Sequence, residues 1–323
     1  MADIDRVLRS NLKLRHLQLL VVLDQFRHLG RAAEFLSLTQ PAVSKTLAEI
    51  ERLFGASLFD RSSRGTETTP HGAAVVRFAR SVLADYERTR DELAAVAAGA
   101  TGRVRVGAMV VATRWLAQAV QLFKQQQPQT TVLVEEGDLM RLLPRLRGGE
   151  LDLIVGRLEP GHAAPDLDTE PLYDEPMVLV TAPGDALTRL RKPGWADVAV
   201  RPCVLPPPYA SLRIKLDQQF HRHGLNPPVD LVETASFLAQ VTFIHGRQAV
   251  GVMAHAVAHH FAQQGLLQVL PLAVDLDLPP VGIVTLRGRR ASPGADRFLA
   301  CARSTAPRPA RTPSRRRRAA DQR

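Results

Sequence analysis

The first seventy residues carry apolar side chains at spacings of three and four, which is typical of short amphipathic helices. One helix is predicted over about residues 13–26, and a short second one over 31–36 after a break at Gly30. Thr39 suits the N-cap of a third helix, and Pro41 falls in its first turn, where a missing N–H costs nothing. We expect this third helix to pack inward through a row of apolar positions: Val43, Leu47, Ile50 and Leu53.

A single long helical pattern follows over residues 71–98. At 1.5 Å per residue it would extend ~40 Å, which is more than one small domain can cover. Its imperfect heptad of apolar positions favours pairing of two such helices between two chains. The alternative is a single amphipathic helix that packs on its own domain. Gly99 and Gly102 end the pattern, and we expect a hinge over this stretch.

Residues 103–302 alternate β-branched runs with amphipathic helical stretches, a pattern that predicts an α/β fold with parallel strands. We expect two lobes, the first over about 103–173 and 271–303 and the second over about 174–270. The expected strands cover residues 103–108, 131–135, 151–155, 177–181, 202–206, 231–234, 250–253 and 281–286. The expected helices cover 113–126, 139–147, 211–223, 237–245 and 293–303. Residues 304–323 are mostly Pro, Arg, Ala and Ser, too polar to bury a core, and are predicted to be a disordered basic tail.

The outer face of the third helix begins with side chains that can contact DNA: Gln40, Pro41, Ser44 and Lys45. Glutamine can pair with adenine, lysine can reach guanine acceptors, and serine can bond a base or a phosphate. All lie at the end of the helix that enters the major groove in helix-turn-helix proteins, and helix N-termini attract phosphate. Gly65 then permits a two-stranded wing with Arg64 near its tip, suited to a phosphate or the minor groove. The alternative is an αα-hairpin with solvated polar residues.

The net charge alone does not show that the protein binds DNA. The chain of 323 residues has a formal net charge of +10, but residues 303–323 hold eight arginines and one acid, which gives +7. The other 302 residues therefore carry only +3. Most of the positive net charge lies in the tail, so the inference of DNA binding has to rest on the helix-turn-helix pattern.

Composition narrows the protein class. The length predicts two or three compact units, and 45% hydrophobic residues suffice for their cores. No stretch of about 18 apolar residues predicts a membrane span, and the N-terminus lacks the apolar core of a signal peptide, so we expect a cytoplasmic protein. The two cysteines, Cys203 and Cys301, have neither metal nor redox spacing and read as buried thiols.

Beyond these patterns, the N-terminal region resembles the LysR-type transcriptional regulators. The similarity lies in Arg31-Ala32-Ala33, Leu36, Thr39-Gln40-Pro41-Ala42-Val43-Ser44-Lys45, Glu51, Gly55, Leu58-Phe59-Asp60-Arg61 and Thr69-Pro70-His71-Gly72, and it extends over about residues 12–302. One departure is Thr68, where the family usually has leucine. The resemblance implies four regions: a winged helix-turn-helix over 1–70, a dimerisation helix and hinge over 71–102, an effector-binding domain over 103–303, and the tail.

The resemblance also implies roles for individual residues. Gln40, Pro41, Ser44 and Lys45 would face base edges, Arg31, Thr39 and Thr69 would contact the DNA backbone, and Arg64 would act in the wing. For Arg61, a structural ion pair and a phosphate contact remain equally open. The family's long helix pairs two winged domains, which lets a dimer read an interrupted inverted repeat, and the resemblance favours a homotetramer.

The second half is similar to the family's two-lobed effector domain, which resembles periplasmic solute-binding proteins. Ligands of such folds bind at the carboxyl ends of strands, between the lobes. The residues expected there are Met109, Val110, Asp138 and Arg157 from the first lobe and Pro208, Tyr209 and Phe237 from the second. For each, a packed or solvated loop residue is the alternative. Relatives that bind aromatic acids often place hydroxyls after the first strand, where this chain has Val110 and Val111. Asp138 would repel an anion but could accept bonds from sugar hydroxyls, and the sequence is most similar to sugar-responsive and protocatechuate-responsive regulators. We therefore expect a sugar, with an aromatic acid as the second candidate.

Other protein classes find little support in the sequence. His255 and His259 have the i, i+4 spacing of a metal pair, but no carboxylate lies between them as in the metalloprotease helix, so we expect an exposed helix face and no metal. The glycines form no phosphate loop or dinucleotide fingerprint, and no catalytic triad stands out. We expect no cofactor and no enzyme. A solute-binding protein would need a signal peptide and would have no use for the helix-turn-helix.

Overall fold

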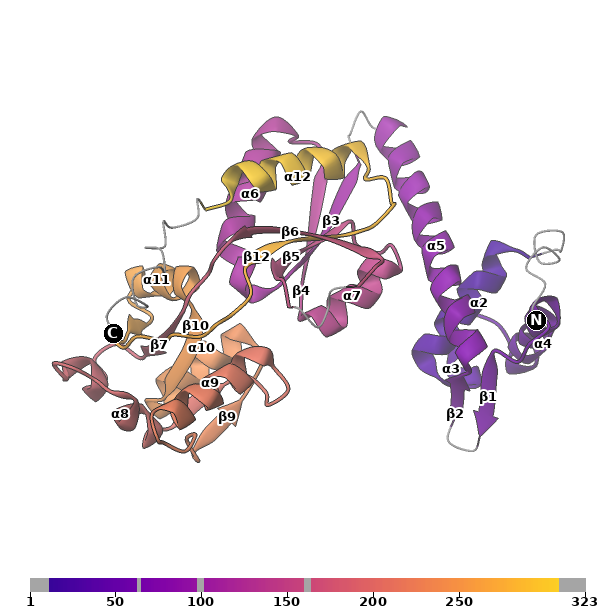
Figure 1. Ribbon diagram of the computed structural model, residues 1–323. Helices are drawn as coiled ribbons and strands as arrows, with labels where there is room; N and C mark the ends of the chain where they lie inside the picture. The colour runs from indigo at the N-terminus through magenta and orange to yellow at the C-terminus, as the bar shows by residue number, and fades with distance from the viewer. Residues whose placement is uncertain (1–11, 63–64, 98–101, 160–163, 308–323) are drawn as a thin grey trace, which may run out of the picture. The chain divides into compact units, whose positions relative to one another are not determined.

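The computed structural model describes residues 12–62, 65–97, 102–159 and 164–307 (Figure 1). The described chain forms two compact units. The first holds the N-terminal helices, the wing and the long helix, together with residues 127–133, 140–152 and the strand that ends near Gly107. The second holds residues 108–126, 134–139 and the remainder from 153 onward.

Three helices and a two-stranded wing form the start of the chain: α2 (Leu14–Phe26), α3 (Leu29–Phe35), α4 (Gln40–Phe54), β1 (Phe59–Ser62) and β2 (Gly65–Thr68). Their core is built from fully or almost fully buried apolar side chains, among them Leu20, Leu23, Val43, Leu47, Ile50 and Leu58. The sequence pattern predicted Leu53 for this core, but Phe54 is the buried residue there and Leu53 is only half-buried. Helix α5 (Pro70–Ala97) follows directly and contributes Val76 to the same core.

The first of two five-stranded sheets has the strand order β4-β3-β5-β12-β6. Its strands are β3 (Arg103–Ala108), β4 (Thr131–Glu136), β5 (Leu153–Arg157), β6 (Leu167–Tyr173) and β12 (Val281–Leu286), and β12 runs antiparallel to β5 and β6. Helix α7 (Leu139–Arg147) follows β4, and α6 (Thr113–Gln126) packs against α12 (Pro293–Thr305). That packing uses the ring pair Phe123–Phe298 and a hydrogen bond of 2.9 Å from the Trp115 indole to the carbonyl of Ala302.

The second sheet has the order β11-β7-β10-β8-β9. Its strands are β7 (Met177–Thr181), β8 (Cys203–Leu205), β9 (Leu231–Glu233), β10 (Val250–Ala254) and β11 (Gln268–Val269). Its helices are α8 (Trp195–Ala199), α9 (Ser211–Arg222), α10 (Phe237–Arg247) and α11 (His255–Gln263). Residues 174–176 and 270–280 connect the two sheets, as the ribbon in Figure 1 shows.

The expected two-sheet α/β architecture is confirmed, and several elements, including α6, α7, β3, β7 and β12, have the expected bounds. One strand expected over 151–155 lies at Leu153–Arg157 instead. The pattern also missed β6, whose proline at position 171 argues against a central strand; β6 is an edge strand, where proline is tolerated. The short helix α8 and the two-residue strand β11 were missed as well.

Candidate functional site

Helix α4 has one face buried in the core and an opposite face open to solvent. Val43, Leu47 and Ile50 are fully buried, whereas the side chains of Gln40 and Lys45 are exposed. The remaining predicted base-facing residues are Pro41, which is exposed, and Ser44, which is half-buried. All four therefore lie in the first two turns of one helix, where Gln40, Ser44 and Lys45 supply hydrogen-bond donors, acceptors and one positive charge.

Thr39 and Arg31 flank this face. The Thr39 hydroxyl accepts a hydrogen bond of 3.4 Å from the backbone N–H of Ala42, so it caps α4 as the sequence predicts. Arg31 is exposed in the first turn of α3, where the imidazole of His28 is the cap and accepts from the N–H groups of Gly30 and Arg31. Residue 30 lies beside α4, because a Cβ there would be 3.7 Å from the amide oxygen of Gln40.

Thr69 has a structural role that the sequence did not reveal. Its hydroxyl donates to the carbonyl of Ser57 at 2.8 Å and accepts from the N–H of Gly72 at 2.9 Å, which caps α5 and fastens it to the turn between α4 and the wing. A Cβ at position 72 would lie 1.8 Å from the carbonyl oxygen of Leu58, so only glycine fits. Since a phosphate only accepts hydrogen bonds, a contact through the Thr69 hydroxyl would compete with the bond to Ser57.

Glu51 organises the turn between α4 and the wing. One of its carboxylate oxygens accepts from the N–H groups of Leu58 at 2.8 Å and Phe59 at 3.2 Å. The hydroxyl of Ser57 adds a longer hydrogen bond of 3.4 Å to the same oxygen. Sequence reasoning gave Glu51 no role; the available signal was an acid in a half-buried position of α4 just before a turn.

Arg64 lies outside the described residues, as does the side chain of Arg61, so the roles expected for both stay predictions. The wing itself is fastened to the loop between α2 and α3. The N–H of Thr66 donates to the carbonyl of Arg27 at 2.9 Å, and a Cβ at position 65 would lie 2.7 Å from that carbonyl oxygen. Gly65, with φ of +129°, is therefore needed both for its backbone conformation and for this close approach.

In the effector half, the predicted residues follow the carboxyl ends of strands. Met109 and Val110 come directly after β3, and Asp138 comes two residues after β4 and is exposed. The Met109 side chain packs against β5, since a Cβ at position 156 would lie 2.4 Å from its sulfur. Val111, next to the half-buried Val110, packs against the core of the second sheet.

Arg157, the last residue of β5, is 6% exposed, and its guanidinium is engaged within the protein. It donates to the carbonyl of Pro279 at 2.7 Å, to the carbonyl of Glu175 at 2.9 Å and to the sulfur of Met177 at 3.6 Å. Pro279 and Glu175 belong to the two connections between the sheets, so Arg157 joins these connections. Burial lowers the pKa of Arg157, and the charges of Glu159 and Glu175 oppose that shift.

Glu175 is a buried acid that the sequence did not indicate. Its carboxylate accepts from the N–H of Ala256 at 2.8 Å, at the start of α11. Desolvation raises the pKa of Glu175, and the Ala256 hydrogen bond and the charge of Arg157 partly offset the rise. The hydrogen bond from Ala256 joins the inter-sheet connection at Glu175 to the start of α11.

The predicted residues of the second sheet are more open. Pro208 and Tyr209 follow β8 and are exposed, whereas Phe237 begins α10 and packs against Phe261 at 4.9 Å between ring centroids. A link missed by the sequence lies nearby: the hydroxyl of Ser211, the first residue of α9, hydrogen bonds to the carboxylate of Glu159 at 2.6 Å. Glu159 follows β5, so this bond joins the carboxyl ends of strands from the two sheets.

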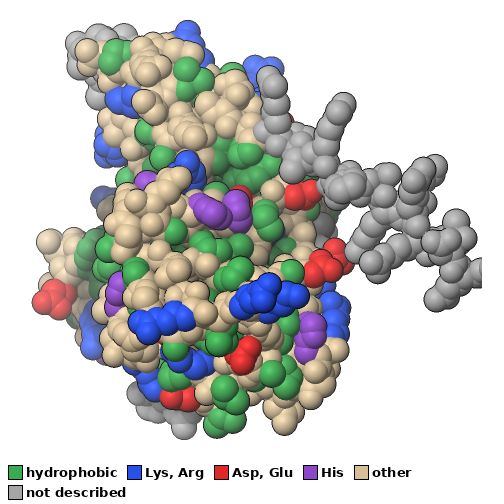
Figure 2. All heavy atoms as spheres, turned by 90° about the vertical axis from the view of Figure 1, so that its left-hand side faces the viewer, with side chains coloured by type: hydrophobic (Ala, Val, Ile, Leu, Met, Phe, Trp, Pro, Cys, Tyr) green, Lys and Arg blue, Asp and Glu red, His purple; other side chains and the backbone are tan. Residues whose placement is uncertain are grey.

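Within the described ranges, no group of three or more His, Cys, Asp or Glu side chains could hold a metal ion. The rings of His255 and His259 lie 4.2 Å apart on the exposed face of α11, and His260 contacts Arg114 at 3.2 Å. Figure 2 shows that the face it draws carries histidines, carboxylates and basic side chains in separate small groups, with hydrophobic side chains between them. Among the described helices, none is both long and apolar enough to cross a membrane.

Comparison with known proteins identifies both halves. Residues 14–73 match the bacterial regulatory helix-turn-helix protein, lysR family, and residues 97–307 match the LysR substrate binding domain. The chain belongs to the LysR family. It is therefore a LysR-type transcriptional regulator, with a helix-turn-helix DNA-binding domain and an effector-binding domain.

Relatives and solved structures agree along nearly the whole length. The LysR-type chain is 34% identical over 301 residues to the HTH-type transcriptional regulator GbpR of Azospirillum brasilense, covering 92% of this chain and 87% of the relative. It is 29% identical over 275 residues to the HTH-type transcriptional regulator PcaQ of Agrobacterium fabrum, covering 85% and 88%. Full-length CbnR complexed with its target DNA shares the fold, with a TM-score of 0.66 at 19% identity, over 91% of this chain and all of that one.

Proposed function

We propose that this LysR-type regulator reads an interrupted inverted repeat with the α4 helices of two chains, Gln40 and Lys45 contacting bases, together with Pro41 and Ser44. The observation that carries the proposal is the start of α4, where the exposed Gln40, Pro41 and Lys45 lie opposite a fully buried face. Arg31 and Thr39 flank the start of α4 and would hold the DNA backbone, with Thr69 and Arg64 as further backbone and wing contacts. A helix fixed this firmly in the core presents its bidentate donors in one orientation, as base recognition requires.

The assembly that we propose is a homodimer joined through α5, or a homotetramer of two such dimers. The long helix exposes large apolar side chains in the described chain, among them Phe78, Tyr86 and Leu93. Pairing two copies of α5 would remove this apolar surface from water. Because its target is chromosomal DNA, the regulator would act in the cytoplasm.

The effector that we propose is a neutral sugar, bound by Met109, Val110, Asp138, Arg157, Pro208, Tyr209 and Phe237. Three observations favour it over an aromatic acid. The positions after β3 are valines without hydroxyls, the flanking groups Asp138 and Glu159 are acids, and the guanidinium of Arg157 already donates to two carbonyls. Carboxylates accept hydrogen bonds from sugar hydroxyls but repel a carboxylate ligand.

Salt-titrated mobility shifts with three variants test the DNA proposal. Gln40→Ala and Lys45→Ala should each lower affinity for the operator by ~1–3 kcal/mol and relax discrimination at one base pair, and Gln40→Ala should hardly change binding to random DNA. Residues 304–323 carry net positive charge but lie outside the helix-turn-helix. Deleting them should weaken specific and random binding alike and flatten the dependence of affinity on salt. If the deletion altered base preference and Gln40→Ala left it intact, α4 would not be the recognition helix.

Thermal melting with a panel of sugars and aromatic acids tests the effector proposal, since a ligand of the folded state raises the melting temperature. A sugar should raise it, and Asp138→Asn should reduce that rise. Stabilisation by an aromatic acid alone would overturn the sugar assignment.

A further inference from the structure

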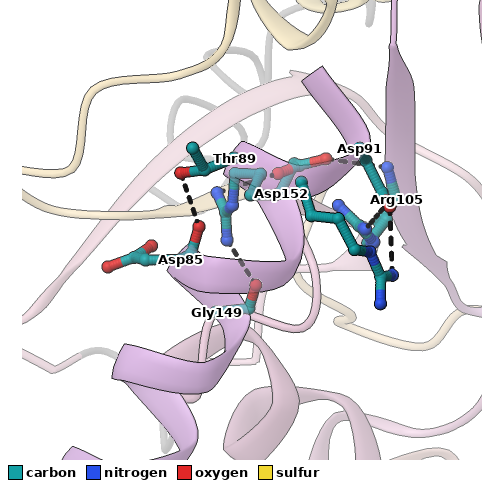
Figure 3. Close-up of polar contacts among 8 residues, drawn as sticks. Asp85, Thr89, Asp91, Arg105, Gly149 and Asp152 are labelled. Carbon is teal, nitrogen blue, oxygen red and sulfur yellow. Dashed lines mark hydrogen bonds and ion pairs between the residues drawn. The ribbon is translucent and has the colours of Figure 1, made fainter. Parts of the chain in front are cut away.

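A second group of charges lies on α5, outside the DNA-reading and effector residues. Arg88 forms an ion pair of 3.2 Å with Asp152 and donates to the carbonyl of Gly149 (Figure 3). The two charged side chains are 14% and 4% exposed. Asp152 immediately precedes β5, so this contact joins the long helix to the start of a fully buried strand.

A second ion pair joins the same helix to the same sheet, with the acid on the helix and the arginine on the strand. The guanidinium of Arg105 on β3 lies 2.6 Å from the carboxylate of Asp91 on α5, and the backbone N–H of Arg105 donates to Asp152 at 2.8 Å. Although desolvation raises it, the hydrogen bond from Arg90 and the nearby arginine charges hold the pKa of Asp91 below its ordinary value. Helix α5 thus supplies one cation and one anion, and the paired starts of β3 and β5 supply the opposite charges.

The loop between α7 and β5 contacts α5 closer to the winged domain. Arg80 of α5 pairs with Asp24 of α2 at 2.9 Å and with Glu150 at 3.5 Å, and Glu150 pairs with Arg145 of α7 at 2.9 Å. The backbone approaches closely here, since a Cβ at position 148 would lie 3.6 Å from the Cβ of Arg80. A single arginine therefore contacts an acid of the winged domain and an acid of the effector half.

These contacts lie within the first compact unit of the chain. The strands that begin at them lead to the proposed effector residues: β3 ends at Ala108, directly before Met109, and β5 ends at Arg157. Both strands are almost wholly buried, and close-packed interiors transmit strain. A shift at their carboxyl ends would therefore reach Arg105 and Asp152, and through them α5.

We propose, on the basis of the effector function above, that Arg88 and Asp152, with Arg105 and Asp91, are positioning residues that couple the effector-end of β3 and β5 to the orientation of α5. We name the four residues the strand–helix clamp. None of the four is among the residues proposed above to contact DNA or effector. Arg80 and its partners form a more exposed auxiliary contact of smaller weight, because exposed ion pairs contribute little.

Reciprocity gives a test that needs no identified effector. If the clamp couples the two ends, operator binding must change the affinity for effector by the same factor as an effector changes operator affinity. Its structural counterpart is a change at the effector ends of β3 and β5 when DNA binds. The probe is a DNA fragment selected from genomic DNA by the wild-type full-length protein, used at saturating concentration. The readout is amide hydrogen exchange over residues 109–112 and 153–159, with and without this DNA.

If the local opening free energy of these segments shifts by a coupling of the usual size, saturating DNA should change their exchange in the wild type by about five- to 150-fold. Asp152→Asn, which retains an oxygen for the Arg105 N–H but loses the charge, should abolish most of that change, as should Arg88→Gln. The double variant should lose no more than either single one, and Arg88→Lys should restore part of the change. The matched control is Arg303→Gln, which breaks the exposed ion pair with Glu170 elsewhere on the first sheet and should respond to DNA as the wild type does.

The proposal is overturned if the wild type binds the fragment without any change in these segments, or if the clamp variants keep the full change. Melting curves identify a variant that fails to fold, and Arg88→Lys then carries the test. Failure of the function proposed above has a different signature, because the fragment would then bind without dependence on Gln40.

Discussion

Removing the carboxylate of Glu51 should loosen the turn that joins the recognition helix to the wing. Hydrogen bonds to charged groups contribute ~1.5–3 kcal/mol each, and an amide left without its acceptor loses part of its compensation for burial. Leu58 and Phe59 are 0% and 3% exposed, so water cannot easily replace the carboxylate. For the two amides together we expect Glu51→Ala to destabilise the turn by roughly 2–4 kcal/mol.

Hydrogen exchange followed by mass spectrometry measures this locally, without treating a multidomain chain as two-state. At 1.4 kcal/mol per factor of ten, protection of the Leu58 and Phe59 amides should fall roughly 30- to 700-fold. In Glu51→Gln, which keeps an acceptor oxygen without the charge, the protection of these amides should lie between that of the wild type and that of Glu51→Ala. The control is Glu49→Ala on the exposed face of the same helix. Equal protection in Glu51→Ala and Glu49→Ala would refute the role assigned to the carboxylate.

Three further outcomes follow from burial and from the exposed face of α5. Burial raises the pKa of the Cys203 thiol to about 12, so alkylation at mildly alkaline pH should be slow in the folded protein and fast in urea; rapid labelling of the folded protein at Cys203 would contradict this. Because the pKa of Glu175 is raised in the folded state, its charged form destabilises the fold above that pKa, and the loss is relieved as the pH falls through it. Glu175→Gln should therefore raise the melting temperature at neutral pH, by an increment that disappears toward pH 4.5; an increment independent of pH would exclude titration of this carboxyl as its source. Light scattering at micromolar concentration should give a dimer or larger, and a monomeric full-length protein would rule out pairing through α5.

Short-range patterns predicted the winged half well because its elements follow local rules. Thr39 and Pro41 mark the start of α4, and the alternation of buried and exposed positions follows from helical periodicity. The shift of burial from Leu53 to Phe54 comes from packing against the wing and α5, which no local pattern encodes.

The candidate site was less predictable where polar groups serve the fold. Thr69 and Glu51 bond to backbone groups that only the folded turn brings within reach. For Arg157, at the end of a strand, the sequence predicts an effector contact but not its partners Pro279 and Glu175, which are distant in sequence. Contacts of this kind depend on topology, and a single sequence offers no signal for them.

The joint at Gly72 leaves the winged domain no freedom to swivel on the long helix. With backbone atoms packed where a side chain would be, and with Val76 one turn later embedded in the same core, the first turn of α5 and the recognition helix form one solid piece. In the proposed dimer, the distance between the two recognition helices is then set by the angle at which the two α5 helices cross. That distance fixes the spacing between the two half-sites. Operators with an added base pair between half-sites would be rejected for geometric reasons, even with every base contact available.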